Sequence, residues 1–250
     1  MSLTSGFLLH LIELRQRLLK MVLGFVFVLI CLLPFANNIY HWLATPLLVN
    51  LPSSAHMIAT EITTPFFVPM KAAMLLAVII SSPFMLYQTW AFIAPGLYQH
   101  EKRFVLPLIV ASFILFLLGM LFAYQIVLPL VIAFFTHTAP EGVVVMTDIS
   151  HYLDFVISML IAFGLAFEVP IVVIVLARMN VVTIEKLKDF RSYFIVLAFI
   201  IAAIVTPPDV VSQLALAIPM CILYEVGIWA AQIFIKHTQA PDAEPSQDAP

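Results

Sequence analysis

The sequence predicts an all-α membrane protein with six transmembrane helices and both termini on the cytoplasmic side. Of its 250 residues, 63% are hydrophobic and only 10% are charged, which lies far outside the range of soluble globular proteins. Uncharged runs that could span the ~30 Å hydrocarbon core of a bilayer recur along the chain, and the basic residues fall between alternate runs. We therefore expect a single transmembrane domain, residues 1–235, followed by a disordered cytoplasmic tail, residues 236–250.

The N-terminal segment, residues 8–20, is predicted to form an interfacial helix, because its apolar residues share one helical face and its charges fall toward the other. It lacks the short apolar core and small-residue cleavage site of a removable signal peptide, so we expect none. The first span follows from Met21 to about Phe35, where Pro34 and two asparagines end the apolar run. Prolines and interfacial aromatics then predict a structured loop on the bilayer surface over residues 37–65.

The second, third and fourth spans are predicted at residues 66–93, 104–135 and 152–177. The second carries Lys71 near its outer end, from which a lysine amine can reach the membrane interface. The third is longer than the hydrocarbon core requires, so we expect it to be tilted.

The fifth and sixth helices are predicted to be short. Ser192 to Thr206 would cover only about 22 Å as a helix before the Pro207-Pro208-Asp209 break, which is less than the thickness of the core. The sixth run, residues 210–235, contains Pro219, at which it could kink.

The basic residues set the orientation. Of the 11 lysines and arginines, all but Lys71 lie before the first span, in the loops after the second and fourth spans, or after the sixth. By the positive-inside bias these segments are cytoplasmic, and the agreement across every loop also supports the count of six spans.

Glu168 is the one charged residue between Asp154 and Arg178 and lies ten residues before Arg178, about 15 Å from that end of a helix. A carboxyl group near mid-membrane is costly in lipid, so it should face protein or water and marks a functional site. One hypothesis is a proton-coupled small-solute transporter in which Glu168 changes its protonation state, with Glu225 as a relay partner at similar depth.

Common enzyme and metal motifs are absent from the sequence. It has no GxxxxGK phosphate-binding loop, no HExxH, no cysteine and histidine spacing typical of zinc, and no GxSxG. We therefore expect no enzyme activity and no catalytic residue, no metal site, no cofactor and no nucleic-acid partner.

Four segments resemble one family closely. They are HLIELRQRL at 10–18, WAFIAPGLYQHEKR at 90–103, FEVP at 167–170 and TPPDVVSQ at 206–213. They are similar to TatC, the multi-span subunit of the bacterial twin-arginine protein translocase, and the resemblance covers residues 8–235. It departs at Gln16, where a basic residue is common, and in the acidic, proline-rich tail.

The resemblance implies recognition rather than catalysis. TatC-like proteins lie in the bacterial cytoplasmic (inner) membrane, where they bind the paired arginines of the signal peptides of folded substrate proteins. They assemble with single-span subunits of the TatA and TatB type and use the proton-motive force for export. A homo-oligomer within the receptor complex, surrounded by membrane lipid, is also expected.

On this resemblance we expect a signal-peptide site at the cytoplasmic edge of the membrane. Its residues are Glu13, Arg15, Arg17, Phe92, Glu101, Lys102 and Arg103. Glu13 and Glu101 could each take one arginine, since a planar guanidinium matches a carboxylate better than an ammonium does. The alternative is that Glu13 pairs only with Arg17, four residues later, and that Glu101 lies on a solvated face.

Two further groups of polar residues lie toward the middle and the outer side of the membrane. Glu168 and Gln213 are expected to line an intramembrane polar groove. Thr206, Pro207 and Asp209 are candidates for docking a partner helix at the outer turn, although they could simply cap that turn. Six helices make a bundle only about 30 Å across, too narrow to enclose a folded domain, so other subunits must form the path.

Overall fold

The computed structural model describes residues 3–50, 57–93, 105–138, 147–179, 181–206 and 209–238. These ranges are almost entirely helical, apart from two strands of two residues each, β1 (Met57–Ile58) and β2 (Thr147–Asp148). Five of the described helical segments are long and apolar enough to cross a membrane, and α9 (Arg191–Val205) is a shorter apolar helix. The predicted all-α architecture with six membrane helices is confirmed.

The first span is continuous with the segment that precedes it. α1 (Leu3–Leu32) runs without a break through both, so the predicted interfacial helix is the start of a longer helix and no separate element. A single 3₁₀ turn, η1 (Leu33–Phe35), follows with Pro34 near its start, where a proline is tolerated because its missing N–H has no helical partner there. Part of the predicted surface loop then forms α2 (Ala36–Asn50).

The second and third spans follow their predicted ranges. α3 (Thr64–Ile93) keeps both of its interior prolines, Pro69 and Pro83. The third span consists of α4 (Val105–Phe122), the π-helical turn η4 (Ala123–Val127) and α5 (Leu128–Thr138). The wide turn ends two residues before Pro129, whose ring would otherwise clash with the carbonyl four residues earlier.

The fourth span is broken in the middle. It consists of α6 (Ile149–Ala166) and α7 (Val169–Arg178), and Pro170 lies in the first turn of α7. A proline at this position cannot donate to the carbonyl of Ala166, so the helix stops and restarts. Glu168 therefore occupies the break, directly before α7.

The last two membrane helices differ in length. α9 has 15 residues and is short, as predicted. α10 (Val210–Thr238) has 29 residues, so the expectation of a short sixth helix was wrong. Pro219 does not end α10, because packing against α7 and α9 supports the helix on both sides of the proline. α10 also extends three residues into the predicted tail, and residues 239–250 lie outside the described part of the chain.

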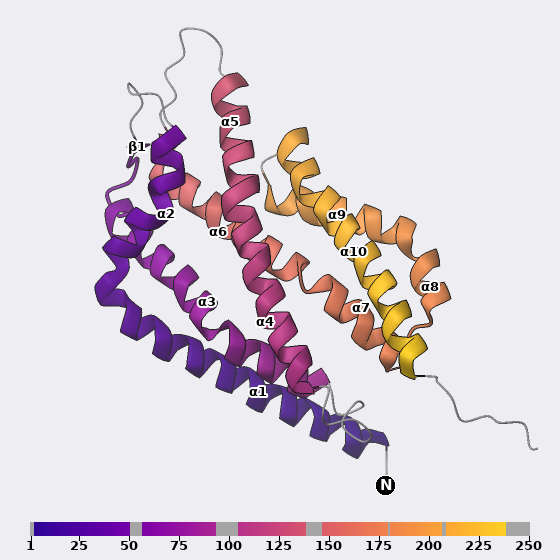
Figure 1. Cartoon of the computed structure of the whole chain (residues 1–250). Coiled ribbons are helices and arrows are strands. Elements are labelled where there is room, and N and C mark those ends of the chain that lie inside the picture. The colour runs from indigo at the N-terminus through magenta and orange to yellow at the C-terminus, as the bar shows by residue number, and fades with distance from the viewer. Residues whose placement is uncertain are drawn as a thin grey trace, which may run out of the picture.

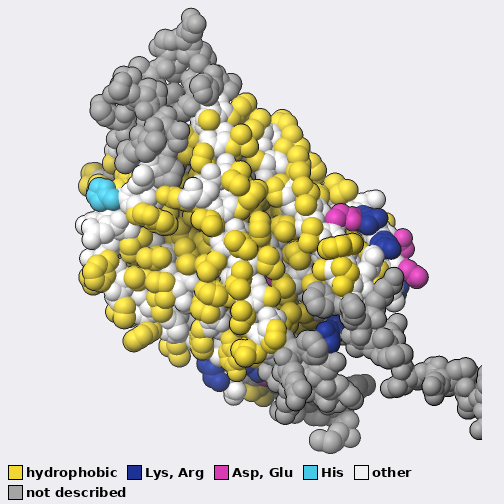
Figure 2. Space-filling model, viewed as in Figure 1, with side chains coloured by type: hydrophobic (Ala, Val, Ile, Leu, Met, Phe, Trp, Pro, Cys, Tyr) yellow, Lys and Arg dark blue, Asp and Glu magenta, His cyan; other side chains and the backbone are white. Residues whose placement is uncertain are grey.

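The helices form a row of packed pairs. Figure 1 shows α1 and α3 on one side of the molecule and α8 (Ile184–Asp189), α9 and α10 on the other, with α4, α5, α6 and α7 between them. α1 packs on α3, α4 packs on α6, and α10 packs on α7 and α9. The surface in Figure 2 is largely hydrophobic, with charged side chains gathered at the edges, as expected of a chain surrounded by lipid.

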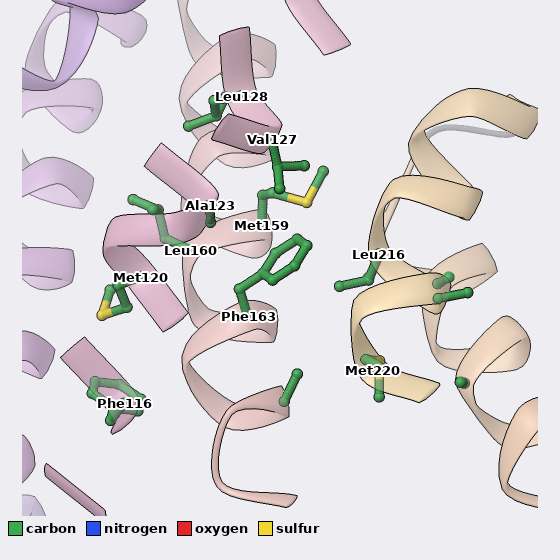
Figure 3. Close-up of a cluster of buried hydrophobic side chains, with 14 of the residues drawn as sticks. Phe116, Met120, Ala123, Val127, Leu128, Met159, Leu160, Phe163, Leu216 and Met220 are labelled. Carbon is green, nitrogen blue, oxygen red and sulfur yellow. The ribbon is translucent and has the colours of Figure 1, made fainter. Parts of the chain in front are cut away.

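The core lies where α4, α6 and α10 meet. Figure 3 shows the Phe163 ring of α6 between the α4 side chains and Leu216 of α10, with Met159 and Met220 close by. Phe163 and Met159 are fully buried. These side chains hold α4, α6 and α10 together.

The backbones of α4 and α6 approach closely at Gly119. A Cβ atom added at Gly119 would lie 2.5 Å from the carbonyl oxygen of Phe163. A backbone oxygen cannot rotate away as a side chain can, so the helices would have to separate.

We expect Gly119→Ala to lower the free energy of unfolding by about 1–3 kcal/mol, the usual cost of overpacking a core. Gly24→Ala is the matched control, because its new Cβ would meet only the Phe84 ring, at 3.0 Å, and that ring is exposed and free to move. Thermal unfolding of both variants in detergent measures the difference. Equal losses in the two variants would contradict the close approach of α4 and α6.

The two strands tie the segments before α3 and α6 together. β1 and β2 pair in parallel, and the Asp148 carboxylate accepts hydrogen bonds from the hydroxyl and the N–H of Thr60, at 2.6 and 3.1 Å. It also caps α6 by accepting from the N–H groups of Ser150 and His151, at 2.8 and 3.1 Å. These hydrogen bonds, the one from the Thr60 hydroxyl foremost, lower the pKa of Asp148 to about 2. The carboxylate is therefore ionised near neutral pH, and the link between the two segments persists.

Candidate functional site

At the N-terminal end of the first span, Arg17 links α1 to α3. Its Nε and Nη2 donate to Oε1 of Glu13 at 2.9 and 2.7 Å, and its Nη1 donates to Oε1 of Gln88 at 3.3 Å. Gln88 is buried in α3. Gln88 was not predicted as a site residue, although its amide lies inside an otherwise apolar run.

The Glu13 carboxylate keeps one oxygen available. Both bonds from Arg17 end on Oε1, and no described residue donates to Oε2. The Glu13 side chain is 38% exposed and that of Arg17 is 23% exposed. The pairing of Glu13 with Arg17 thus occurs, yet it leaves room for a second guanidinium.

The other residues expected at this site are only partly described. Arg15 is exposed on α1, and Phe92 is half-buried near the end of α3. Glu101, Lys102 and Arg103 lie outside the described residues. The structure therefore brings together Glu13, Arg17 and Gln88 and leaves the second carboxylate of the site as a prediction.

A buried polar cluster surrounds the break in the fourth span. The Trp90 indole of α3 donates to the Ser112 hydroxyl of α4 at 2.8 Å, and Ser112 is fully buried. Glu168 is 7% exposed, and neither of its carboxylate oxygens has a hydrogen-bond partner within the described ranges. The Ser112 hydroxyl lies beside this carboxylate without making a well-aligned hydrogen bond. An unpaired buried carboxylate is rare enough to indicate a site that takes water or a polar guest.

Gln213 does not join this cluster through a hydrogen bond. Its amide donates to the carbonyl oxygen of Phe199 in α9 at 3.3 Å, which ties α10 to α9. Glu168 and Gln213 were expected to line one groove. Gln213 is instead hydrogen-bonded to α9, whereas Glu168 lies in the buried polar cluster at the break.

The residues of the outer turn act locally as caps. The Thr206 hydroxyl donates to the carbonyl of Ala202 at 2.8 Å and is buried. Oδ2 of Asp209 accepts from the N–H of Ser212 at 2.7 Å in the first turn of α10. Pro207 lies outside the described residues. Capping leaves Oδ1 of Asp209 buried without a hydrogen-bond partner in the described part of the chain.

Two ion pairs between helices were not predicted. Lys71 of α3 does not simply reach toward the interface, because its ammonium contacts both oxygens of Asp154 in α6, at 2.6 and 2.8 Å. Arg191 of α9 contacts both oxygens of Glu225 in α10, at 2.6 and 2.7 Å. Glu225, the expected relay partner of Glu168, is therefore held by the guanidinium of Arg191.

The chain matches one family along most of its length. Residues 9–219 match the family model for the Sec-independent protein translocase protein (TatC). The TatC protein of Haemophilus influenzae is 54% identical over 225 residues, which cover 90% of this chain and 88% of that protein. The TatC protein of Escherichia coli strain K12 is 47% identical over 232 residues, which cover 93% and 90%.

A solved structure agrees with these relatives. The crystal structure of a twin-arginine translocase receptor, TatC, superimposes with a TM-score of 0.82 at 42% sequence identity and covers 90% of this chain and 98% of that one. The fold and the sequence therefore lead to the same assignment. The chain belongs to the TatC family and is a multi-span receptor subunit of the Sec-independent protein translocase, and no enzyme.

Proposed function

We propose that this subunit binds the paired arginines of signal peptides at the cytoplasmic edge of the membrane, through Glu13 and Glu101. The observation that carries the proposal is Oε2 of Glu13, to which none of the described residues donates, on a carboxylate that Arg17 already holds in place. A fixed carboxylate loses little conformational freedom when it accepts a second guanidinium, so more of the interaction energy appears as affinity.

The surroundings of the carboxylates decide how selective the site is. A fully exposed ion pair contributes about 0–1 kcal/mol, whereas a hydrogen bond to a charged group in a partly shielded pocket contributes ~1.5–3 kcal/mol. Glu13 is only partly exposed, and the buried Gln88 lies behind its partner Arg17. We therefore infer shielded binding, with Phe92 near the peptide and Arg15, Lys102 and Arg103 at the rim.

We also propose how the protein is oriented in the membrane and with which subunits it assembles. Both termini lie in the cytoplasm, and the bacterial inner membrane holds the protein among single-span subunits of the TatA and TatB type and further copies of itself. These subunits form the path for folded proteins and use the proton-motive force, because six helices are too few to enclose a folded domain. The outer turn with Thr206, Pro207 and Asp209 docks a partner helix, whose polar groups would satisfy the buried Oδ1 of Asp209.

Binding of two matched peptides tests the proposal. A labelled signal peptide with an Arg-Arg pair and its Lys-Lys variant are titrated against the full chain in detergent. We expect the Arg-Arg peptide to bind at least about tenfold more tightly, which corresponds to ~1.4 kcal/mol. Equal binding of the two peptides, or no binding of either, would overturn the receptor site.

A further inference from the structure

The helices α7, α8, α9 and α10 lie together on one side of the molecule (Figure 1). Their side chains line an apolar groove. Its volume is about 510 Å³, and among the described residues that line it only Lys186 is charged. The stacked rings of Phe194 and Tyr224, 4.1 Å apart, contribute to its wall. The Tyr224 hydroxyl donates to the carbonyl of Leu187 at 2.8 Å, so its one proton is not available to a guest.

The groove has about the length of one lipid leaflet. It extends along the fourth span from Leu165, next to the break, to Leu176 near the end of α7. These two positions are eleven residues apart, at most about 16 Å at the rise of a helix, which is close to half of the ~30 Å hydrocarbon core. The groove therefore reaches from the middle of the membrane to one surface.

The end of the groove at α8 has the features of the headgroup level. Phe190 and Tyr193 are exposed and stacked there, with ring centroids 5.6 Å apart, and aromatic rings favour the interface. Figure 2 shows acidic and basic side chains gathered at the edge of the molecule where α8 lies. Lys186 is exposed, and its ammonium contacts no carboxylate among the described residues. An anionic group at the mouth of the groove would therefore meet an unpaired cation.

The dimensions favour a slender guest over a helix. A helix is about 10 Å wide, so 510 Å³ would contain only ~6.5 Å of its length, about four residues. An acyl chain is much narrower and can lie lengthwise in the groove.

We propose that this groove binds one acyl chain of an anionic phospholipid, with the lipid phosphate at Lys186. The lipid belongs to the leaflet on the α8 side of the membrane. It fills the space between α7, α8 and α9 and so holds the short helix α9 against the rest of the bundle. This site is independent of the proposed arginine-binding site at the other side of the molecule.

Native mass spectrometry of the full chain in detergent tests the site with two lipids of identical chains, dioleoyl phosphatidylglycerol and dioleoyl phosphatidylcholine. A lysine near a membrane surface favours an anionic lipid by about fivefold, so we expect a phosphatidylglycerol preference of that size. Lys186→Gln should remove the preference. Lys188→Gln is the matched control, because Lys188 lies on the same helix and does not line the groove, and it should keep the preference.

A second variant tests the groove itself. Val172→Trp places a large ring in the groove and should weaken binding of both lipids several-fold. A phosphatidylglycerol with a photoreactive acyl chain gives a readout that does not depend on this variant, and in the unmodified chain it should label Val172 or Leu176. Equal binding of the two lipids, equal effects of Lys186→Gln and Lys188→Gln, or labelling that misses the groove would overturn the proposal. Competition of the photolabel by a signal peptide or a partner helix would identify that segment as the occupant and would also overturn it.

Discussion

Replacing both Glu13 and Glu101 with glutamine should abolish the preference for an Arg-Arg over a Lys-Lys signal peptide. Each carboxylate is expected to contribute ~1.5–3 kcal/mol to arginine binding, so two of them give on the order of 10²- to 10⁴-fold discrimination. Glutamine keeps the size of the side chain and one acceptor oxygen but removes the charge. The measurement is the ratio of the two dissociation constants, obtained by fluorescence anisotropy on the full chain in detergent.

The single variants separate the two sites. Glu13→Gln leaves Arg17 bonded to Gln88, so α1 should stay in place while the arginine preference falls by about tenfold or more. Glu61→Gln is the control, since Glu61 is an exposed carboxylate directly before α3, at the opposite end of that helix from Gln88. An unchanged preference in Glu101→Gln would remove Glu101 from the site, and an unchanged preference in the double variant would place arginine recognition elsewhere.

The second large effect is expected at Glu168, where export and stability should respond in opposite directions. Glu168→Leu should lower export of a twin-arginine reporter into inverted membrane vesicles at least about tenfold, because it removes the polar group of the buried cluster. The same change should not lower the unfolding temperature. It removes a buried carboxylate without a described partner, and such a group costs about 1–3 kcal/mol.

Glu168→Gln distinguishes a polar role from proton transfer. Glutamine can still bond to water and to the Ser112 hydroxyl, but it cannot exchange a proton, so we expect export to continue at near the normal rate. Loss of export in this variant would instead support a proton relay through Glu168. Export that continues in Glu168→Leu would show that neither role is needed.

Apolar runs and basic loops were enough to predict the number of membrane helices. The exact ends of the helices were harder to predict, because the sixth helix was expected to be short, whereas α10 runs through Pro219 and packs on α7 and α9. In the fourth span, by contrast, the helix does break next to a proline, because Pro170 lies in the first turn after the break at Glu168. The difference between the two prolines lies in tertiary contacts, which a single sequence does not contain.

The contacts at the site, too, could be predicted from the sequence only in part. The pairing of Glu13 with Arg17 follows from their spacing of four residues, and it was considered from the sequence. The bond from Arg17 to Gln88 joins residues 71 positions apart, and the pairs Lys71 with Asp154 and Arg191 with Glu225 are 83 and 34 positions apart. Each partner was visible as a charged or polar residue near an apolar run, but only the fold shows which residues meet.

The unbroken course of α1 has a mechanical consequence. None of the most apolar stretch of the first span is buried, and α1 is supported chiefly along one side by α3. Glu13 lies 20 residues before the turn at Leu33, about 30 Å along a rigid helix. A rotation of ~5° about that turn displaces Glu13 by about 2.5 Å, enough to break or form a hydrogen bond. A small tilt of α1 about the turn near one face of the membrane therefore moves the Glu13 carboxylate near the other face. The hydrogen bond from Arg17 to Gln88 holds α1 against α3.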